Sequence, residues 1–275
     1  MRLLLVGLAV ASLVSGCRRK HVPVESIPDL GCPACADEGG LDASTTLVAA
    51  GHIRSGPTSR EQNVVERFEL RKTSCGYRLR ARQEWPLTIS DIEVRYDADL
   101  APRWAWKRMT LPGTPRADGN ADIRSYELRT GDVFIKRRDS HGQTTMEQLL
   151  PGGRMKVPSG ARVGAVVGPG RGVMTAWIKR AKLSVGERST ELVLDFREML
   201  ESLEVAVLVR NPDQFEPAFH RTVRVYTFYG RETVFADDDD VVIGDLAGMR
   251  PSDSLTTPEP EPLPDYGGAD PARGM

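Results

Sequence analysis

The middle of the chain is dominated by an alternation of apolar and polar residues with a period of two. Residues 77–82 read Tyr-Arg-Leu-Arg-Ala-Arg, which places three arginines on one face and the apolar groups on the other. Residues 92–96, 203–209 and 222–229 alternate in the same way. Because successive side chains of a strand point to opposite faces, this pattern predicts strands with one face buried and one face in water.

Shorter alternating segments and turn signals extend the pattern over most of the chain. The turns are rich in Gly, Asp and Ser and lie at residues 73–76, 130–132, 139–142 and 230–231. Because short connections of this kind join neighbouring strands into hairpins, we expect antiparallel pairing. The predicted fold class is mainly β, with a curved antiparallel sheet that forms a half-barrel or a sandwich. The further strands expected are residues 47–53, 64–71, 104–111, 124–128, 133–137, 190–196 and 232–236.

One segment, residues 173–182, has helical rather than strand periodicity. Its basic residues lie off the apolar face, so the segment predicts one short amphipathic helix. Since the apolar face of a curved sheet must be covered, we expect this helix to cover an opening, with Trp177 as its anchor. Trp177 and Ile178 then either close a ligand cavity or plug the core. The apolar face consists of Val173, Trp177, Ile178 and Ala181.

The first sixteen residues have the features of a secretory signal peptide. Arg2 is followed by an apolar run to Val14, which is shorter than the about 20 residues of a transmembrane helix. The run ends in Val14-Ser15-Gly16-Cys17, which resembles the lipobox of bacterial lipoproteins. The resemblance implies that residues 1–16 are removed and that lipid is attached to Cys17. The alternative is an ordinary cleaved signal in which this cysteine has no such role.

The same resemblance implies a place in the bacterial cell envelope. Acyl chains on Cys17 would anchor the chain to a membrane, and Arg18, Arg19 and Lys20 would lie at the level of the lipid head groups. In enteric lipoproteins, an Asp directly after the lipidated Cys retains the protein in the inner membrane. Because Arg18 stands at that position here, we expect the periplasmic face of the outer membrane rather than the inner membrane.

Both ends of the processed chain lack hydrophobic periodicity. Residues 17–43 contain Pro, Gly and acidic residues, and residues 251–275 are rich in Pro and acidic groups. Such segments bury too little apolar surface to fold, so we expect a lipidated flexible tether and a disordered tail. The β domain is then expected at residues 44–250, which is long enough for a sizeable core.

The overall charge argues against nucleic acid as a partner. The 275 residues include 37 Lys and Arg against 38 Asp and Glu, which gives a formal net charge of −1. No field of the whole domain would therefore attract a phosphate backbone. The partners that we expect are a membrane, through Cys17, and a hydrophobic ligand or an envelope protein. Signatures such as a Gly-x-Ser-x-Gly elbow do not occur, so we expect neither an enzyme nor a cofactor.

Cys32 and Cys35 have the spacing of a redox pair, but they lie in the predicted tether rather than at the start of a helix. Since an exported chain meets oxidising conditions, we expect a local disulfide between them, or exchange with Cys75. Redox activity is one alternative, and metal binding by two or three cysteines and a histidine is another. We do not expect a metal site.

Two further motifs each have a structural and a functional interpretation. Residues 168–172, Gly-Pro-Gly-Arg-Gly, follow an apolar run and precede the predicted helix, which is the setting of a phosphate-binding loop. The fingerprint fails at Val173, where a third glycine belongs, and no βαβ alternation is visible, so a plain loop is favoured. The run Asp237–Asp240 could hold Ca²⁺ but lacks the EF-hand spacing, which favours a solvated hairpin turn.

Trp104 and Trp106 share one face of a predicted strand. An aromatic cluster of this kind either lines a ligand cavity or belongs to the core. We therefore take Trp104 and Trp106, together with Trp177 and Ile178, as the candidate lining of a hydrophobic ligand cavity.

An exported β domain with a curved sheet and one short helix is similar in architecture to the half-barrel proteins of lipoprotein and lipid trafficking. The resemblance implies a concave sheet that cradles acyl chains under a helical lid, and it transfers no binding residue. The leading hypothesis is a non-catalytic β domain that binds a lipid, an envelope polymer or a protein partner. The alternatives are a structural or assembly component of an outer-membrane complex, and a hydrolase or redox enzyme.

Overall fold

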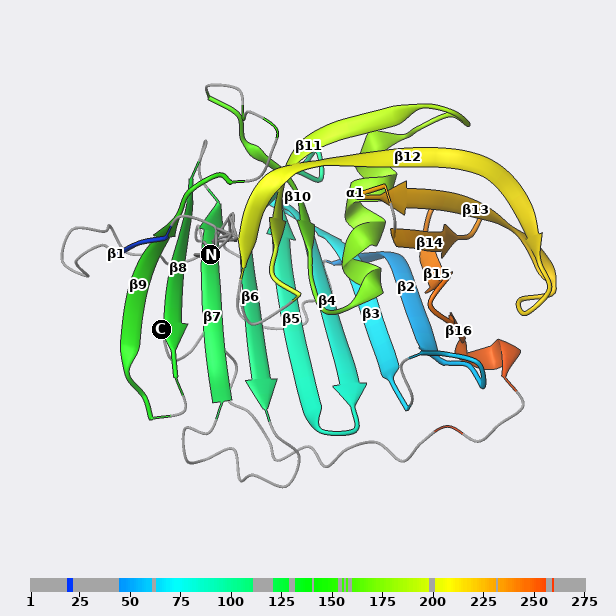
Figure 1. The fold of residues 1–275 in the computed structure, drawn as a ribbon, viewed down its shortest axis with the longest axis horizontal. Coiled ribbons are helices and arrows are strands. Elements are labelled where there is room, and N and C mark those ends of the chain that lie inside the picture. Colours follow the sequence, from blue (N-terminus) through cyan, green and yellow to red (C-terminus); the bar gives the residue numbers. More distant parts are fainter. Residues whose placement is uncertain are drawn as a thin grey trace, which may run out of the picture.

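The chain folds into two β-sheets with one short α-helix between them (Figure 1). The structure is a computed structural model, and it describes residues 19–21, 45–60, 63–110, 121–128, 132–139, 141–152, 155, 157, 160–197, 201–230, 232–255 and 259. The fold is mainly β, with curved antiparallel sheets that form a half-barrel, as the alternation of apolar and polar residues predicts.

The larger sheet has ten strands, and every neighbouring pair in it is antiparallel. Its order is β1-β9-β8-β7-β6-β5-β4-β3-β2-β16, so that strands consecutive in sequence from β2 to β9 lie side by side. This arrangement confirms the predicted antiparallel pairing. The strands are β1 (Arg19–His21), β2 (Thr46–Ser55), β3 (Val65–Thr73), β4 (Gly76–Trp85), β5 (Thr88–Tyr96), β6 (Pro102–Thr110), β7 (Ala121–Leu128), β8 (Val133–Arg138), β9 (Thr144–Leu149) and β16 (Met249–Pro251).

The smaller sheet has six strands in the order β10-β11-β12-β13-β14-β15. Its first pair, β10 and β11, is parallel, and the chain between them forms the 3-10 helix η3 (Arg171–Val173) and the helix α1 (Met174–Ala181). A parallel pair needs such a crossover connection. The expectation that the chain has no βαβ unit is therefore wrong at this place. The strands are β10 (Val163–Val167), β11 (Arg188–Asp195), β12 (Ser202–Glu216), β13 (Arg221–Phe228), β14 (Glu232–Ala236) and β15 (Val242–Asp245).

The helix α1 ends at Lys182, which adopts the left-handed conformation with φ 47°. The N–H of Lys182 donates to the carbonyl of Ile178 at 3.3 Å, which closes the last turn. Lys179 and Arg180 lie in this last turn, where positive charge is favourable next to the free carbonyl groups. The predicted short helix is confirmed.

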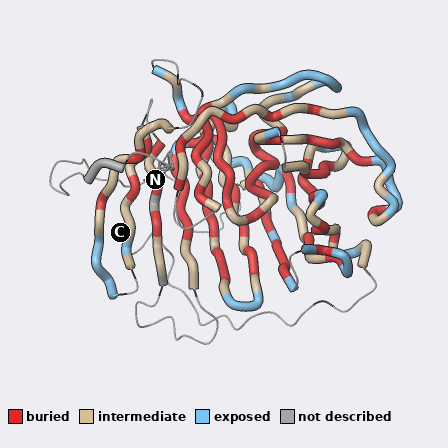
Figure 2. Tube along the Cα trace, in the orientation of Figure 1, coloured by how far each residue is buried: buried red, intermediate tan, exposed pale blue. Residues whose placement is uncertain are grey.

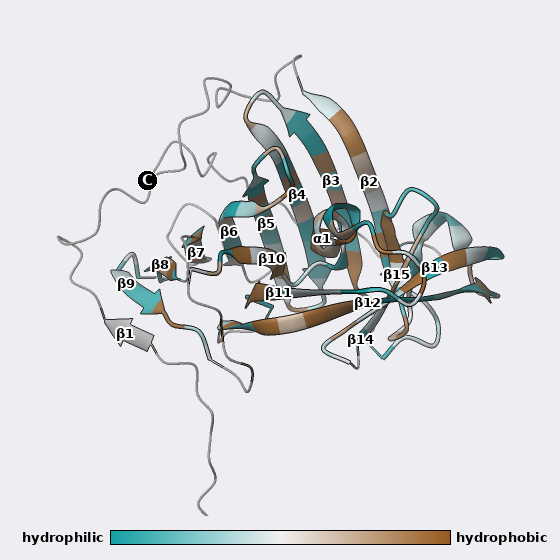
Figure 3. Cartoon of the chain, turned by 90° about the horizontal axis from the view of Figure 1, so that it is seen from above, coloured by the Kyte–Doolittle hydropathy of each residue, from teal (hydrophilic) through white to brown (hydrophobic). Residues whose placement is uncertain are grey.

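The helix α1 lies between the two sheets, as the view from above shows (Figure 3). Ala176 belongs to the main core cluster, which includes the inner face of the larger sheet. Trp177 and Ile178 belong to a second cluster with residues of the smaller sheet, among them Val193 and Leu208. The helix therefore links the two layers by burying apolar side chains in both clusters.

The inner face of the larger sheet is apolar, and its outer face is charged. Leu79 and Ala81 on β4 are buried in the main core, while Arg78, Arg80 and Arg82 alternate with them on the outer face. Figure 2 shows the buried residues gathered on the central strands and on the elements that cover them. The predicted orientation of this strand is confirmed.

Glu93 on β5 is the centre of an ion-pair network on the outer face. Its carboxylate is contacted by Arg78 at 2.7 Å, by Arg80 at 3.2 Å and by Arg95 at 2.8 Å. The Glu93 side chain is only 5% exposed, so the guanidinium groups both pair with it and cover it. The network joins β4 to β5 on the side of the sheet that faces away from the core.

A second polar cluster is buried between the two sheets. Lys107 is 1% exposed, and its Nζ donates to the carbonyl of Phe196 at 2.6 Å. Next to it, Arg124 pairs with Glu201, and the hydroxyl of Tyr126 donates to Glu201 at 3.0 Å. Burial lowers the pKa of Lys107 to about 8, with a further contribution from the positive charge of Arg124. These bonds tie β6 and β7 to the segment that connects β11 with β12.

The folded region extends beyond the predicted boundaries of 44 and 250. Within the predicted tether, β1 forms one edge of the larger sheet and pairs with β9, with Arg19 opposite Leu149. At the other end, Pro251 is buried and pairs with Ile53 of β2, and Glu259 forms an ion pair with Arg67. An edge strand tolerates proline because one side of it has no hydrogen-bonding neighbour. The start of the Pro-rich segment therefore docks on the sheet.

Candidate functional site

A cleft of about 610 Å³ opens between the larger sheet and one end of the smaller sheet. The larger sheet contributes residues of β4, β5 and β6, and the smaller sheet contributes the ends of β13, β14 and β15. The loop that leads into α1 forms part of the wall. The apolar lining includes Trp85, Met109, Val167, Met174, Phe228 and Val234, and the polar lining includes Gln83, Ser90, Arg171, Arg197, Glu232 and Asp245.

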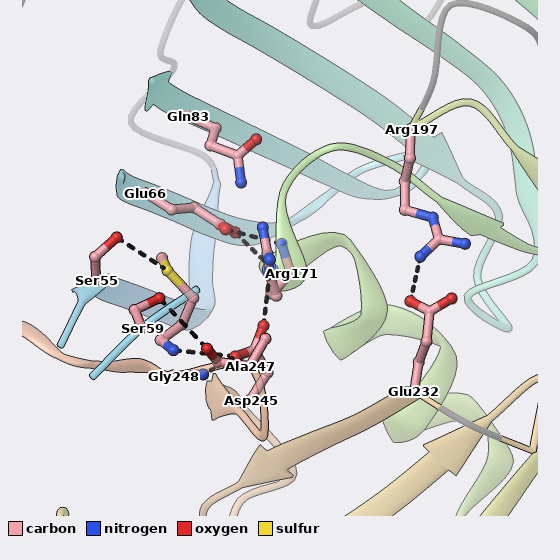
Figure 4. A network of polar contacts seen from close by, with 12 residues as sticks. Ser55, Ser59, Glu66, Gln83, Arg171, Arg197, Glu232, Asp245, Ala247 and Gly248 are labelled. Carbon is pink, nitrogen blue, oxygen red and sulfur yellow. Dashed lines mark hydrogen bonds and ion pairs between the residues drawn. The ribbon is translucent and has the colours of Figure 1, made fainter. Parts of the chain in front are cut away.

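The Gly-rich loop, residues 168–172, is held against the larger sheet by Glu66 of β3. The carboxylate of Glu66 accepts hydrogen bonds from the backbone N–H of Arg171 at 2.8 Å and of Gly172 at 2.6 Å (Figure 4). Glu66 is fully buried, and this burial raises its pKa, although the charge of Arg171 and the two N–H groups oppose the shift. A phosphate group would use N–H groups of this kind. Here a carboxylate of the protein occupies them, which supports the interpretation of a plain loop.

The glycines of this loop are required by close packing. A Cβ atom at position 172 would lie 2.2 Å from Cδ1 of Phe68, and a Cβ at position 170 would lie 2.9 Å from Oε1 of Glu66. In the neighbouring strand β2, where Gly51 pairs with Phe68, a Cβ at position 51 would lie 2.2 Å from Cε1 of the same ring. Phe68 therefore fills the space that Gly51 and Gly172 leave open.

Arg171 connects the loop to the end of the smaller sheet. Its Nε donates to Oδ2 of Asp245 at 2.8 Å, and Figure 4 shows Arg171 between Glu66 and Asp245. The other oxygen of Asp245 accepts hydrogen bonds from the backbone N–H of Gly248 at 2.9 Å and of Met249 at 3.0 Å. One carboxylate thus fixes both the arginine and the turn between β15 and β16.

Arg197 occupies another part of the cleft wall. Its Nη2 donates to Asp195 at 2.6 Å, and its Nη1 pairs with Glu232 of β14. The guanidinium also lies over the rings of Phe228, at 5.6 Å, and Tyr229, at 5.8 Å. The hydrogen bonds and charges of Asp195 and Glu232 outweigh burial and hold the pKa of Arg197 above its usual range. Two of the three arginines that line the cleft, Arg171 and Arg197, therefore carry a carboxylate partner, and the third, Arg60, is exposed.

Gln83 is the central polar residue on the part of the cleft that the larger sheet provides. It lies on β4 in phase with Leu79 and Ala81, and its side chain is fully buried. Its Oε1 accepts a hydrogen bond from the indole N–H of Trp85 at 2.7 Å. Ser90 on β5 is directly opposite Gln83 in the sheet, so its hydroxyl lies on the same face.

The four aromatic and aliphatic residues predicted to line a cavity are placed elsewhere. Trp104 and Trp106 are on the outer face of β6, where Arg95 lies 5.1 Å from the Trp104 ring and Arg108 lies 5.7 Å from the Trp106 ring. Trp177 and Ile178 are 2% and 0% exposed in the second core cluster. None of the four lines this cleft.

The Asp237–Asp240 run forms the turn between β14 and β15. Asp237 accepts hydrogen bonds from the backbone N–H of Asp239 and Val241, at 3.0 and 2.9 Å, and Asp240 pairs with Arg224 at 2.8 Å. These carboxylates therefore shape a hairpin turn, as the sequence favours. Across the part of the chain that the structure describes, no group of three His, Cys, Asp or Glu side chains could hold a metal ion.

Cys17, Cys32 and Cys35 lie outside the described residues, as do the predicted signal peptide and most of the tether and the tail. Cys75, in the turn between β3 and β4, is disulfide-bonded, and its partner lies outside the described residues. Of the helices in the described ranges, none is long and apolar enough to cross a membrane.

Sequence reasoning missed most of the polar residues of the cleft, although signals existed for two of them. Gln83 is a polar residue in phase with the apolar residues of its strand, and Arg171 lies within the Gly-rich loop. Arg197, Glu232 and Asp245 carry no comparable signal, because only the folding of the smaller sheet brings these strand ends together.

Comparison with known proteins gives distant structural likeness only. No protein-family model and no curated protein matches the chain. Two solved structures align with it over most of their length. One is a DUF1089 family protein from Pseudomonas aeruginosa, with 16% identity, a TM-score of 0.38, and coverage of 69% of this chain and 92% of that one. The other is a β-barrel-like protein of the domain of unknown function DUF1849 from Brucella abortus, with 14% identity, a TM-score of 0.37, and coverage of 71% and 82%.

Proposed function

We propose that this chain is a lipid-anchored protein of the bacterial envelope, held through Cys17, whose β domain binds an amphiphilic lipid in the cleft between its two sheets. The anchor rests on the resemblance of Val14-Ser15-Gly16-Cys17 to a lipobox. The binding role rests on the cleft, and the proposal is that of a non-catalytic carrier or receptor.

One observation carries the binding proposal: the cleft combines an apolar and a polar lining within about 610 Å³. Phe228, Met174 and Met109 offer contacts for a hydrocarbon chain, and methionine adapts to ligands of different shape. Gln83, Ser90 and the paired arginines offer hydrogen bonds to a head group. Sites for small molecules in proteins have a volume in this range.

The test is native mass spectrometry of the full chain purified from bacterial membranes, with extraction and identification of any bound lipid. Ser90→Trp should block the cleft and abolish lipid retention, because Ser90 is buried and lines it. Thr110→Trp is the matched control, since Thr110 is on the outer face of the neighbouring strand and should leave retention unchanged.

Two outcomes would contradict the proposal. Lipid that is retained in full by Ser90→Trp would show that the cleft is not the site. Copurification of an envelope protein without any lipid would favour the docking or assembly role. In that case the exposed Leu246 at the cleft rim, 69% exposed, is the first residue to replace.

A further inference from the structure

Gln83 presents a buried hydrogen-bond donor to the cleft. Its side chain is fully buried, it lines the cleft, and among the described residues its Nε2 has no hydrogen-bond acceptor. An amide NH₂ that is buried without an acceptor destabilises the folded state. Such a group therefore indicates an acceptor that the residues described in the structure do not supply.

The orientation of the Gln83 amide is determined by Trp85. The indole N–H of Trp85 is a donor only, so the atom of Gln83 that lies 2.7 Å from it must be the oxygen. The Nε2 atom must then point away from Trp85. Figure 4 shows this nitrogen directed towards the loop that carries Arg171. The usual ambiguity between amide oxygen and nitrogen does not arise here.

The charges around Gln83 define the kind of acceptor. Arg171 is paired with Asp245, and Arg197 is paired with Asp195 and Glu232, so two of the three arginines that line the cleft are already balanced. The third, Arg60, is exposed to solvent, where a charge contributes little to binding. A negatively charged ligand group would meet the paired carboxylates. An uncharged oxygen would accept from Gln83 without this repulsion.

We propose that Gln83, together with the hydroxyl of Ser90, binds the carbonyl oxygen of an uncharged acyl ester or amide. In this arrangement the carbonyl lies at the polar part of the cleft, and the acyl chain extends along Met109, Met174 and Phe228. The inference rests on the proposed function and specifies its ligand as an acylated amphiphile without charge at its acyl linkage.

The experiment compares two probes that differ only at this linkage. The probes are 1-monooleoylglycerol, which has an ester carbonyl, and its 1-O-oleyl ether, which has none. Their affinities for the full chain are measured by native mass spectrometry in the same maltoside detergent. Because the detergent competes equally with both probes, the ratio of the two affinities is the quantity to compare. We expect the ester to bind about fivefold more tightly, the effect of one neutral hydrogen bond.

Variants at position 83 test the assignment to this residue. Gln83→Met keeps the length of the side chain and removes the donor, and it should bring the ratio close to one without weakening the ether. Ser90→Ala should reduce the ratio in part. Arg80→Met, on the outer face of the same strand, is the control and should leave the ratio unchanged.

Equal affinities for the two probes in the unaltered chain would overturn this inference and leave the proposed function standing. A preference for the ester that persists in Gln83→Met would overturn it too. So would much tighter binding of 1-oleoyl lysophosphatidic acid that does not depend on Gln83, which would assign the head group to the arginines. If no probe binds at all, both this inference and the proposed function are contradicted.

Discussion

Lys107 is a charged residue in an almost fully buried position, and its burial affects both its own pKa and the stability of the folded chain. Its ammonium donates to the carbonyl of Phe196 and lies close to Arg124, which is itself paired with Glu201. Burial outweighs the nearby carboxylates, so its pKa falls from the ordinary 10.5 to about 8. The charged form of Lys107 is therefore less favourable in the folded chain than in the unfolded chain.

The stability of the folded state should consequently rise with pH between about 8 and 9.5. In this window the unfolded chain binds more protons than the folded chain, and linkage then stabilises the folded state as pH increases. Because of this pKa shift, the free energy of unfolding should be about 2 kcal/mol larger at pH 9.5 than at pH 7. Urea unfolding of the unaltered chain and of Lys107→Met, measured at both pH values, should show this gain only in the former. A pH response that is equal in the two chains would contradict the assignment.

Trp177 is a core residue, and its replacement should have the consequences of a cavity. It is 2% exposed among Leu208, Val193 and other residues of the second core cluster. Trp177→Ala should lower the free energy of unfolding by about 3–5 kcal/mol, measured by urea denaturation. Trp85→Ala, at the half-buried wall of the cleft, should cost less stability and change lipid retention instead. If Trp177→Ala instead changed lipid retention at little cost in stability, and Trp85→Ala did the opposite, Trp177 would close a ligand cavity.

For single residues, the sequence predicts which side chains of a strand face the core only where apolar and polar residues alternate. Residues 77–82 alternate without exception, and the structure confirms which of them are inside. The stretch Trp104-Ala105-Trp106 is apolar throughout, so both phases are compatible with burial. Its true phase is set by Ala105, which faces the core opposite Val94, and by arginines of the outer face that cover both tryptophans.

Among the secondary-structure elements, the connection from β10 to β11 most affects the cleft. It combines a strand, the Gly-rich loop and α1, and Glu66 holds the loop by its N–H groups. Because Met174 and the loop both form cleft wall, the position of this connection sets the shape of the site.

Gly172→Ala should therefore move the loop and destabilise the chain. Its Cβ would overlap the ring of Phe68, and overpacking of this kind typically costs about 1–3 kcal/mol. Adding Phe68→Leu should recover part of the loss, because the smaller side chain makes room. Thermal unfolding of the two single variants and the double variant measures this coupling. Strict additivity of the two losses would show that the residues do not share the space.

The parallel pair could not be predicted from the alternation of residues. Both β10 and the middle of β11 are apolar without interruption, which is compatible with either direction of pairing. Their direction follows from α1, which is long enough to return the chain to the same end of the sheet. The hairpins of the larger sheet, in contrast, are specified locally by short turns, and they were predicted well.

For the whole molecule, the remaining prediction concerns the anchor. Cys17→Ser should abolish labelling with palmitate and give an unprocessed or soluble form, because no other side chain in the lipobox could accept the lipid. Cys32→Ser is the matched control and should remain labelled. Membrane fractionation and metabolic labelling of the two variants provide the measurement. Full labelling of Cys17→Ser would remove the lipoprotein assignment while leaving the cleft and its ligand open to test.

The position of Phe68 between Gly51 and Gly172 also constrains how this chain could diverge. Three positions that are far apart in the sequence share one volume, so a substitution at any of them changes what the other two tolerate. Among descendants of this chain, a side chain larger than glycine at 51 or 172 should appear together with a residue smaller than phenylalanine at 68. Residues 51, 68 and 172 are therefore expected to covary among related sequences. That covariation would identify the proteins in which the Gly-rich loop packs against the larger sheet in the same way.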